Sequence, residues 1–214
     1  MARYSGTERL EARRARLERH AAETDAGVVL KAAARYLELR TRSIDEVRWH
    51  LRAARFPQSV VEEAIARLVE LGLLDDLAFA QAWVESRDRA RPRGSQALRR
   101  ELALKGIDRE TIEGLLAGRR DAPEAADFDT ADEGTADVVA APGSPDERAA
   151  DKLLLKNRVS LARVADPRLR RQRAYALLAR NGFDPEICRD VSARWAATQS
   201  DADKDGGEEP AESP

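Results

Sequence analysis

The sequence predicts an all-α protein made of three tandem three-helix repeats that stack into an elongated, curved body. Three observations lead to this fold class. The composition favours slender helices, one apolar spacing recurs three times along the chain, and helix end and start signals stand at the same point of each copy.

The composition defines the general class of protein. The chain has 214 residues, of which 43% are hydrophobic, 36% are charged and only 5% are aromatic. Such a composition builds helices with thin apolar seams more readily than one thick core. No apolar run reaches the roughly 18–20 residues that cross a bilayer, and the charged N-terminal segment does not resemble a secretory signal. We therefore expect a cytoplasmic protein that does not enter a membrane.

The recurring spacing joins a leucine to a large apolar residue five positions later. The pairs are Leu51 with Phe56, Leu102 with Ile107, and Leu178 with Phe183. An apolar residue precedes each leucine by four positions and so shares its helical face. The copies are 51 residues apart and then 76 residues apart. The excess in the second spacing matches an acidic stretch between the second and third copies.

Helix junctions follow each leucine. Gly106 and Gly182 stand where a left-handed residue commonly ends a helix. Arg55 stands there in the first copy, which predicts a weaker or different cap. The residue before the next cap should pack on the residue four positions after that cap. These pairs are Phe56 with Val61, Ile107 with Ile112, and Phe183 with Cys188. The single cysteine is thereby assigned to packing, and it excludes an intramolecular disulfide and a cysteine-based metal site.

The first helices complete the organisation. Residues 36–40 match residues 83–87, and 147–156 is the expected first helix of the third copy. The expected segments are a charged N-terminal arm or helix (1–25), repeat 1 (26–74), repeat 2 (75–118), an acidic disordered linker (119–146), repeat 3 (147–198) and an acidic disordered tail (199–214).

No motif predicts catalysis, and we expect neither an enzyme nor a cofactor or metal site. The chain has no phosphate-binding glycine loop and no dinucleotide fingerprint. His20 and His50 stand apart from any cysteine or carboxylate cluster and are interpreted as surface or helix-face residues. Trp49, Trp83 and Trp195 could stack on nucleobases, but packing is the favoured role for each.

Basic clusters carry the chemical signal. The net charge of −2 hides their segregation, because acidic residues gather in the expected linker and tail. Arginine-rich surfaces suit phosphate backbones or acidic protein grooves, although an ordinary solvated surface is the alternative for any single residue. The candidate residues for binding a partner or DNA are Arg87, Arg89, Arg91, Arg93, Arg99, Arg100, Lys105, Lys152, Lys156, Arg158, Arg163, Arg168, Arg170, Arg171 and Arg173.

A longer motif spans the second repeat. It runs through Gly72-Leu-Leu-Asp-Asp-Leu-Ala-Phe-Ala80, Arg87, Arg93-Gly94, Leu98, Glu101-Leu102 and Lys105-Gly106-Ile107, and it is extended upstream by Tyr36-Leu37, Arg40, Ser43, Glu46 and Leu51. This pattern resembles the signature of the RecX family. The resemblance covers about 28–116 well and 147–198 weakly. Ser95 departs from it, because many relatives carry proline after the glycine, and the acidic insertion leaves the orientation of the third repeat open.

The resemblance implies a regulator of the RecA recombinase. RecX proteins consist of tandem three-helix repeats, lie along the groove of the RecA filament and typically restrain its ATPase, strand-exchange and co-protease activities; some also contact DNA. We therefore expect a non-enzymatic monomer that binds the RecA–DNA filament, with single- or double-stranded DNA as a further partner, and that acts in DNA repair, recombination and the SOS response. The residues alone leave open a direct nucleic-acid-binding protein or a helical scaffold for another partner.

Overall fold

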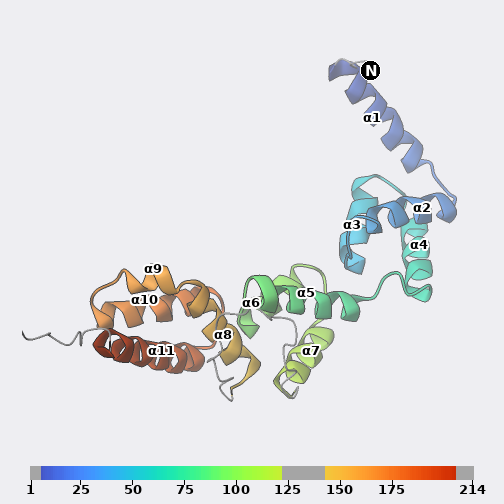
Figure 1. Cartoon of the computed structure of the whole chain (residues 1–214). Coiled ribbons are helices and arrows are strands. Elements are labelled where there is room, and N and C mark those ends of the chain that lie inside the picture. The colour runs from blue at the N-terminus through green and yellow to red at the C-terminus, as the bar shows by residue number, and fades with distance from the viewer. Residues whose placement is uncertain (1–5, 122–142, 206–214) are drawn as a thin grey trace, which may run out of the picture. The chain divides into compact units, whose positions relative to one another are not determined.

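The structure is a computed structural model that describes residues 6–121 and 143–205, and each regular element among them is an α-helix (Figure 1). This confirms the all-α class. The helices are α1 (Gly6–Ala21), α2 (Ala26–Leu37), α3 (Ile44–Ala53), α4 (Gln58–Glu70), α5 (Asp76–Ala90), α6 (Ser95–Ala103), α7 (Arg109–Asp121), α8 (Pro145–Lys156), α9 (Arg158–Ala162), α10 (Pro167–Arg180) and α11 (Pro185–Asp205).

The packing of the chain defines two compact units. The first comprises Met1–Ala82 and Leu102–Ile112, and the second comprises Trp83–Glu101 and Glu113–Pro214. Helices α5, α6 and α7 of the second repeat contribute to both units. Each unit is described by itself.

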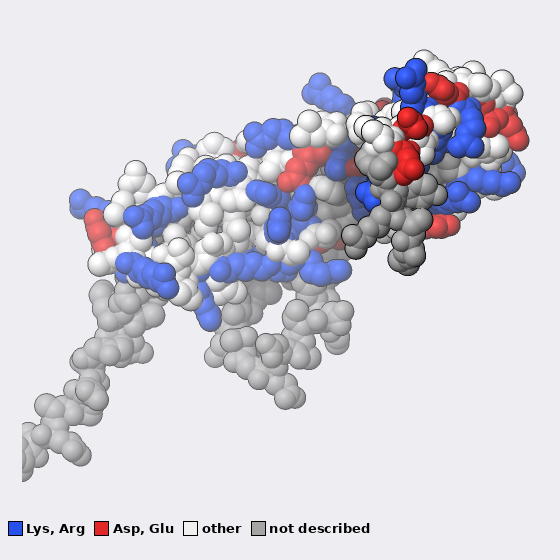
Figure 2. All heavy atoms as spheres, turned by 90° about the horizontal axis from the view of Figure 1, so that it is seen from above, with Lys and Arg blue, Asp and Glu red and all other residues white. Residues whose placement is uncertain are grey.

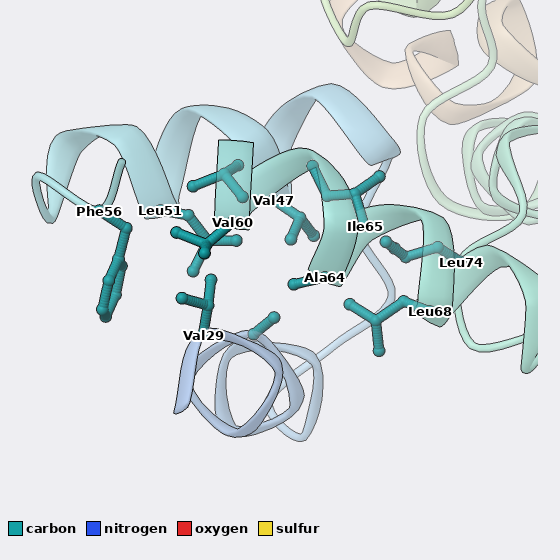
Figure 3. Packing of buried hydrophobic residues seen from close by; sticks show 11 residues of the cluster. Val29, Val47, Leu51, Phe56, Val60, Ala64, Ile65, Leu68 and Leu74 are labelled. Carbon is teal, nitrogen blue, oxygen red and sulfur yellow. The ribbon is translucent and has the colours of Figure 1, made fainter. Parts of the chain in front are cut away.

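In the first unit, α2, α3 and α4 enclose an apolar core (Figure 3). Val29 of α2, Leu51 of α3 and Ala64 of α4 point into the space that the three helices share. Val29 and Leu51 are fully buried, and Ala64 is 1% exposed. Asp25 begins α2 by accepting a hydrogen bond from the Gly27 N–H, and a capping box begins α3. The first repeat is therefore a three-helix bundle, as the sequence predicts.

In the second unit, α10 packs against α8, α9 and α11. Their core contains fully buried Leu154, Leu178 and Cys188, which confirms the packing role of the cysteine. The short helix α9 adds to the three helices that the sequence predicts for this repeat. Helix α8 begins at Pro145, two residues before the predicted start, because Ser144 and Glu147 form a capping box.

The helix junctions share one backbone conformation in all three repeats. The φ angles are 67° at Arg55 and 80° at both Gly106 and Gly182. All six residues of the predicted apolar pairs that follow these positions are buried, with exposures from 0% to 5%. The first copy therefore forms the same junction as the others, but with an arginine in the left-handed conformation that glycine adopts without steric cost.

Three expectations differ from the structure or lie beyond it. The predicted packing role of Trp49 is wrong, because this side chain is 70% exposed. Helix α7 extends to Asp121, so helices occupy both ends of the range expected to be a linker, while 122–142 lies outside the described residues. Helix α11 extends into the expected tail as far as Asp205, and 206–214 also lies outside them.

A polar joint in the first unit links the start of α3 to the second repeat. The Ser43 hydroxyl donates to the Lys105 carbonyl at 2.6 Å, and the Ile44 N–H donates to the Asp76 carboxylate at 2.9 Å. A Cβ at Gly106 would overlap the side chain of α3 that faces it. Glycine is therefore needed at this junction for close approach as well as for its φ angle.

An equivalent joint lies in the second unit, at the start of α6. The Gly94 N–H donates to the Asn181 carbonyl at 3.1 Å, and the Gln96 N–H donates to the Gly182 carbonyl at 3.2 Å. The Ser95 N–H donates to the carboxylate of Asp146, near the start of α8, at 2.9 Å. In both joints, the start of one repeat's second helix therefore receives a turn and a carboxylate from the next repeat.

Candidate partner-binding surface

Six of the fifteen candidate basic residues have partners within the chain. Arg87 lies over the Trp83 ring, 4.3 Å from its centre, and its Nε donates to Glu101 at 2.6 Å. The Trp83 Nε1–H donates to the same carboxylate at 3.0 Å. Trp83 is accordingly half-buried. The Arg87 guanidinium therefore joins α5 to α6.

Arg99 belongs to an ion pair that occurs in two repeats. Its Nε lies 2.8 Å from the Glu113 carboxylate, and Arg48 Nε lies 3.0 Å from the Glu62 carboxylate. Arg99 is 51 residues after Arg48, and Glu113 is 51 residues after Glu62. The hydrogen bond that each arginine donates to its carboxylate raises the arginine pKa, against the opposing effect of burial. This spacing was visible in the sequence and identifies Arg99 as part of the repeat.

Lys105 and Arg93 lie in the joints described above. The Lys105 ammonium is 2.7 Å from the Glu46 carboxylate. Burial alone would raise the pKa of Glu46, but the hydrogen bond and charge of Lys105 outweigh it, so the pKa lies below its ordinary value. The Arg93 guanidinium donates to the Asn181 side-chain oxygen at 2.6 Å. Both residues stabilise contacts between successive repeats.

Lys156 and Arg170 also have structural partners. The Lys156 ammonium donates to the Arg89 and Ala90 carbonyls at the end of α5, at 3.1 and 2.9 Å. Arg170 is 8% exposed, and its Nε donates to the Val164 carbonyl at 2.9 Å. These two residues therefore hold the third repeat together or join it to α5.

The other candidates form the exposed surface. Lys152 is half-buried, and eight arginines are exposed with no ion pair to any other described residue: Arg89, Arg91, Arg100, Arg158, Arg163, Arg168, Arg171 and Arg173. We call these eight the exposed arginine set. Figure 2 shows Lys and Arg outnumbering Asp and Glu on the visible face of the part that contains α8–α11. Asp166 is the sole acidic residue between Lys152 and Arg180, and its carboxylate already caps α10.

Sequence reasoning missed a cluster in which four helices meet. The Arg119 guanidinium of α7 lies 2.6 Å from Asp88 of α5 and 2.6 Å from Asp146 of α8, and Asp146 also accepts from the Ser95 N–H of α6. Arg119 is only 11% exposed. Burial raises the pKa of Asp88, against the lowering effect of the Arg119 charge. The two ends of the acidic stretch are thus joined by an ion pair, a tertiary contact without a local sequence signal.

The histidines also have contacts that the sequence did not indicate. His20 stacks on Phe56 with ring centres 4.1 Å apart, and its Nδ1 is 3.0 Å from the Ala54 carbonyl. Because a carbonyl only accepts, Nδ1 carries the proton in this bond. His50 stacks on Tyr36 at 3.8 Å, and burial lowers its pKa. His20 therefore packs against the first repeat, and His50 packs within it.

Two searches of residues 6–121 and 143–205 bear on other functions. No group of three or more His, Cys, Asp and Glu side chains in these ranges is arranged to hold a metal ion. No helix there is both long and apolar enough to span a membrane.

The described residues define a protein of three-helix repeats that exposes arginines without an ion pair to any other described residue. Two family models match it: the first three-helix domain of RecX over residues 30–68 and the second three-helix domain over 75–116. Regulatory protein RecX of Mycolicibacterium vanbaalenii is 30% identical over 172 residues, which are 79% of this chain and 83% of that relative. The chain belongs to the RecX family of regulatory proteins.

Other relatives and solved structures agree with this assignment. Regulatory protein RecX of Streptomyces coelicolor is 35% identical over 62% of this chain and 58% of its own length. The relative from Halalkalibacterium halodurans is 40% identical over 39% of this chain, a match that spans only 32% of the relative. The crystal structure of RecX from Lactobacillus salivarius superposes with a TM-score of 0.61 at 20% identity, covering 81% of this chain and 97% of that chain. This last similarity concerns the fold.

Proposed function

We propose that this protein binds the RecA–DNA filament and restrains its ATPase, recombinase and co-protease activities. Its membership of a family of regulatory proteins supports a regulatory role. A nucleoprotein filament presents DNA phosphates and protein carboxylates, and guanidinium groups bind both through charge-assisted hydrogen bonds. The protein acts by binding and changes no covalent bond.

The exposed arginine set is the observation that carries this proposal. An arginine that is already paired must lose its partner before it binds another carboxylate or phosphate. The eight exposed arginines have no such partner among the described residues, so they can steer and hold an acidic partner at once. Arg93 and Arg99, by contrast, stabilise the fold, and we assign them no direct contact.

The test is a titration of the single-stranded-DNA-dependent ATPase of the cognate RecA with the full chain. The triple substitution Arg89→Ala, Arg91→Ala and Arg100→Ala should raise the half-inhibitory concentration about tenfold while leaving the melting temperature nearly unchanged. The matched control removes three exposed charges from α1, through Arg9→Ala, Arg13→Ala and Arg16→Ala, and should inhibit like the wild type. Equal inhibition by all three proteins would show that these α5–α6 arginines are only solvated.

Direct nucleic-acid binding is a second candidate function, favoured by the basic surface of α8–α11. It predicts that the chain binds a bare oligonucleotide without RecA and that the affinity falls steeply with salt, because phosphate contacts release counterions. If the chain inhibits RecA but binds bare DNA weakly at every salt concentration, this candidate is excluded and the filament remains the partner.

A further inference from the structure

The two joints allow the same position to be compared in all three repeats. The start of α3 and the start of α6 each receive the next repeat. Ser95 and Ala97 of α6 are 6% and 8% exposed, and the equivalent residues of α3, Ile44 and Glu46, are half-buried. The 76-residue spacing places Arg171 and Arg173 of α10 at the positions of Ser95 and Ala97. Both arginines are exposed.

In the first repeat, the turn that would meet a preceding repeat is already covered by α1. After the second helix of each repeat, one carbonyl of the turn accepts a hydrogen bond from the part of the chain that precedes that repeat. The donors to Lys105 and Asn181 come from the preceding repeats. The equivalent carbonyl of Ala54 lies 3.0 Å from His20 of α1. Helix α1 thus takes the place of a preceding repeat, and among the described residues the position left uncovered is on α10.

The uncovered position differs from the others in a way that indicates its partner. Helix α10 begins at Pro167, four residues before the equivalent of Ser95, so its backbone N–H groups at this position lie within the helix. A turn carbonyl cannot bind there as Gly182 binds the start of α6. The exposed hydrogen-bond donors there are instead the guanidinium groups of Arg168, Arg171 and Arg173, which we call the α10 arginine end.

We propose that the α10 arginine end binds an acidic segment of a partner protein. Both internal joints bring a carboxylate to this position, from Asp76 in the first unit and from Asp146 in the second. The α10 arginine end occupies the equivalent position in the third repeat, but its hydrogen-bond donors are charged side chains instead of backbone N–H groups. Such donors suit a segment that bears several carboxylates. Asp166 already caps the N-terminus of α10, so the helix end itself is not the binding group.

A second copy of this chain does not fit the same position. The turn that docks in each internal joint has a glycine at its left-handed residue, because a Cβ at Gly106 or Gly182 would overlap the helix it meets. The first repeat carries Arg55 there, and its turn carbonyl is bonded to His20. A second copy would bring a bulky cation against the cations of the α10 arginine end, which is repulsive.

The test measures binding of the full chain to two fluorescein-labelled probes with equal numbers of negative charges: a poly-glutamate peptide and an oligothymidylate. The variant Arg171→Glu with Arg173→Glu is compared with a matched reversal on α1, Arg9→Glu with Arg13→Glu. We expect the α10 variant to lose about tenfold in peptide affinity and the control to lose much less. Both variants should lose similar oligonucleotide affinity, since they change net charge equally. Circular dichroism melts confirm that both variants are folded.

Two results would overturn the inference: equal loss of peptide affinity in both variants, or a selective loss of oligonucleotide affinity in the α10 variant. If RecA is the protein that supplies the acidic segment, the inference rests on the proposed function. The same variants are therefore titrated into the RecA ATPase assay. If wild type fails to inhibit, the proposed function falls and the peptide result still decides the α10 site. If wild type and the α10 variant inhibit equally, the proposed function stands and the α10 site is not its RecA contact.

Discussion

Arg99 and Arg100 are adjacent in the chain, yet they have different roles. Arg99 pairs with Glu113 across α6 and α7, as Arg48 pairs with Glu62 one repeat earlier. Arg100 is exposed and pairs with no described residue. On a helix, one position changes the direction of a side chain by 100°, so neighbours can face the core and the solvent. The role of each arginine is therefore set by its helical face rather than by the local density of charge.

Arg55 provides a test at this scale. A non-glycine residue in the left-handed region is strained, and Arg55 has a φ angle of 67°. We expect Arg55→Gly to raise the free energy of unfolding by about 0.5–1 kcal/mol, as glycine relieves more strain than it costs in unfolded-chain entropy. Gly106→Ala should destabilise, because its Cβ would also overlap Asp45. Urea unfolding curves measure both. A destabilising Arg55→Gly would show that the arginine side chain matters more than the backbone.

At the scale of helices, successive repeats are held by hydrogen bonds and ion pairs at helix starts. One joint is formed by hydrogen bonds that involve Ser43, Lys105 and Asp76. The other is formed by hydrogen bonds that involve Gly94, Gly182 and Asp146. Backbone N–H groups at a helix start lack partners within the helix. A carboxylate from the next repeat satisfies one of them while its charge opposes the positive end of the helix dipole. The joints should accordingly respond to pH as well as to packing.

Glu46 makes that response measurable. Its folded pKa lies below the ordinary 4.5 because Lys105 outweighs burial. Its stabilising contribution is therefore present above the unfolded pKa and is lost as the pH falls through the folded value. Glu46→Gln should lower the free energy of unfolding by about 0.5–1.5 kcal/mol at neutral pH. The gap from wild type should close below pH 4.5 in melts recorded across this range. A gap that is independent of pH would assign Glu46 a role other than its ion pair.

The Arg119 cluster predicts a larger effect. Removing this nearly buried guanidinium would leave the Asp88 and Asp146 carboxylates close together without a counter-charge. We expect Arg119→Ala to cost about 3 kcal/mol in the free energy of unfolding. Arg109→Ala, at an exposed position of the same helix, should cost less than about 0.5 kcal/mol. Denaturant midpoints compare the two variants. Similar midpoints would mean that water replaces Arg119 without loss.

For the molecule as a whole, surface charge predicts the salt response of the proposed regulation. Raising NaCl from about 50 to about 200 mM should weaken inhibition of the RecA ATPase, because salt screens charge-driven binding and reduces the free energy gained when counterions are released. The triple variant Arg158→Ala, Arg163→Ala and Arg168→Ala should show a shallower salt dependence than wild type. An inhibitory concentration that does not change with salt would argue for an apolar interface.

The sequence predicted the repeats better than it predicted the candidate site. Periodic apolar residues and caps are local signals, so the three repeats and their junctions could be recognised. Trp49 is two positions from both Val47 and Leu51, which places it off their buried face, and this could have corrected its predicted role. The Arg119–Asp146 pair and the short helix α9 depend on tertiary packing that periodicity does not report. Charge density alone could not separate Arg99, which is paired, from Arg100, which has no ion pair to a described residue.

The burial of Cys188 has a practical consequence for following the motions of this protein. The thiol is fully enclosed in the third repeat, and burial raises its pKa, with the charge of Asp184 adding to the effect. Reaction with a thiol reagent therefore requires the repeat to open, and its rate reports the frequency of that opening. A cysteine introduced at an exposed position would react first. Dyes or spin labels could thus be placed at one chosen site while the native cysteine stays unmodified.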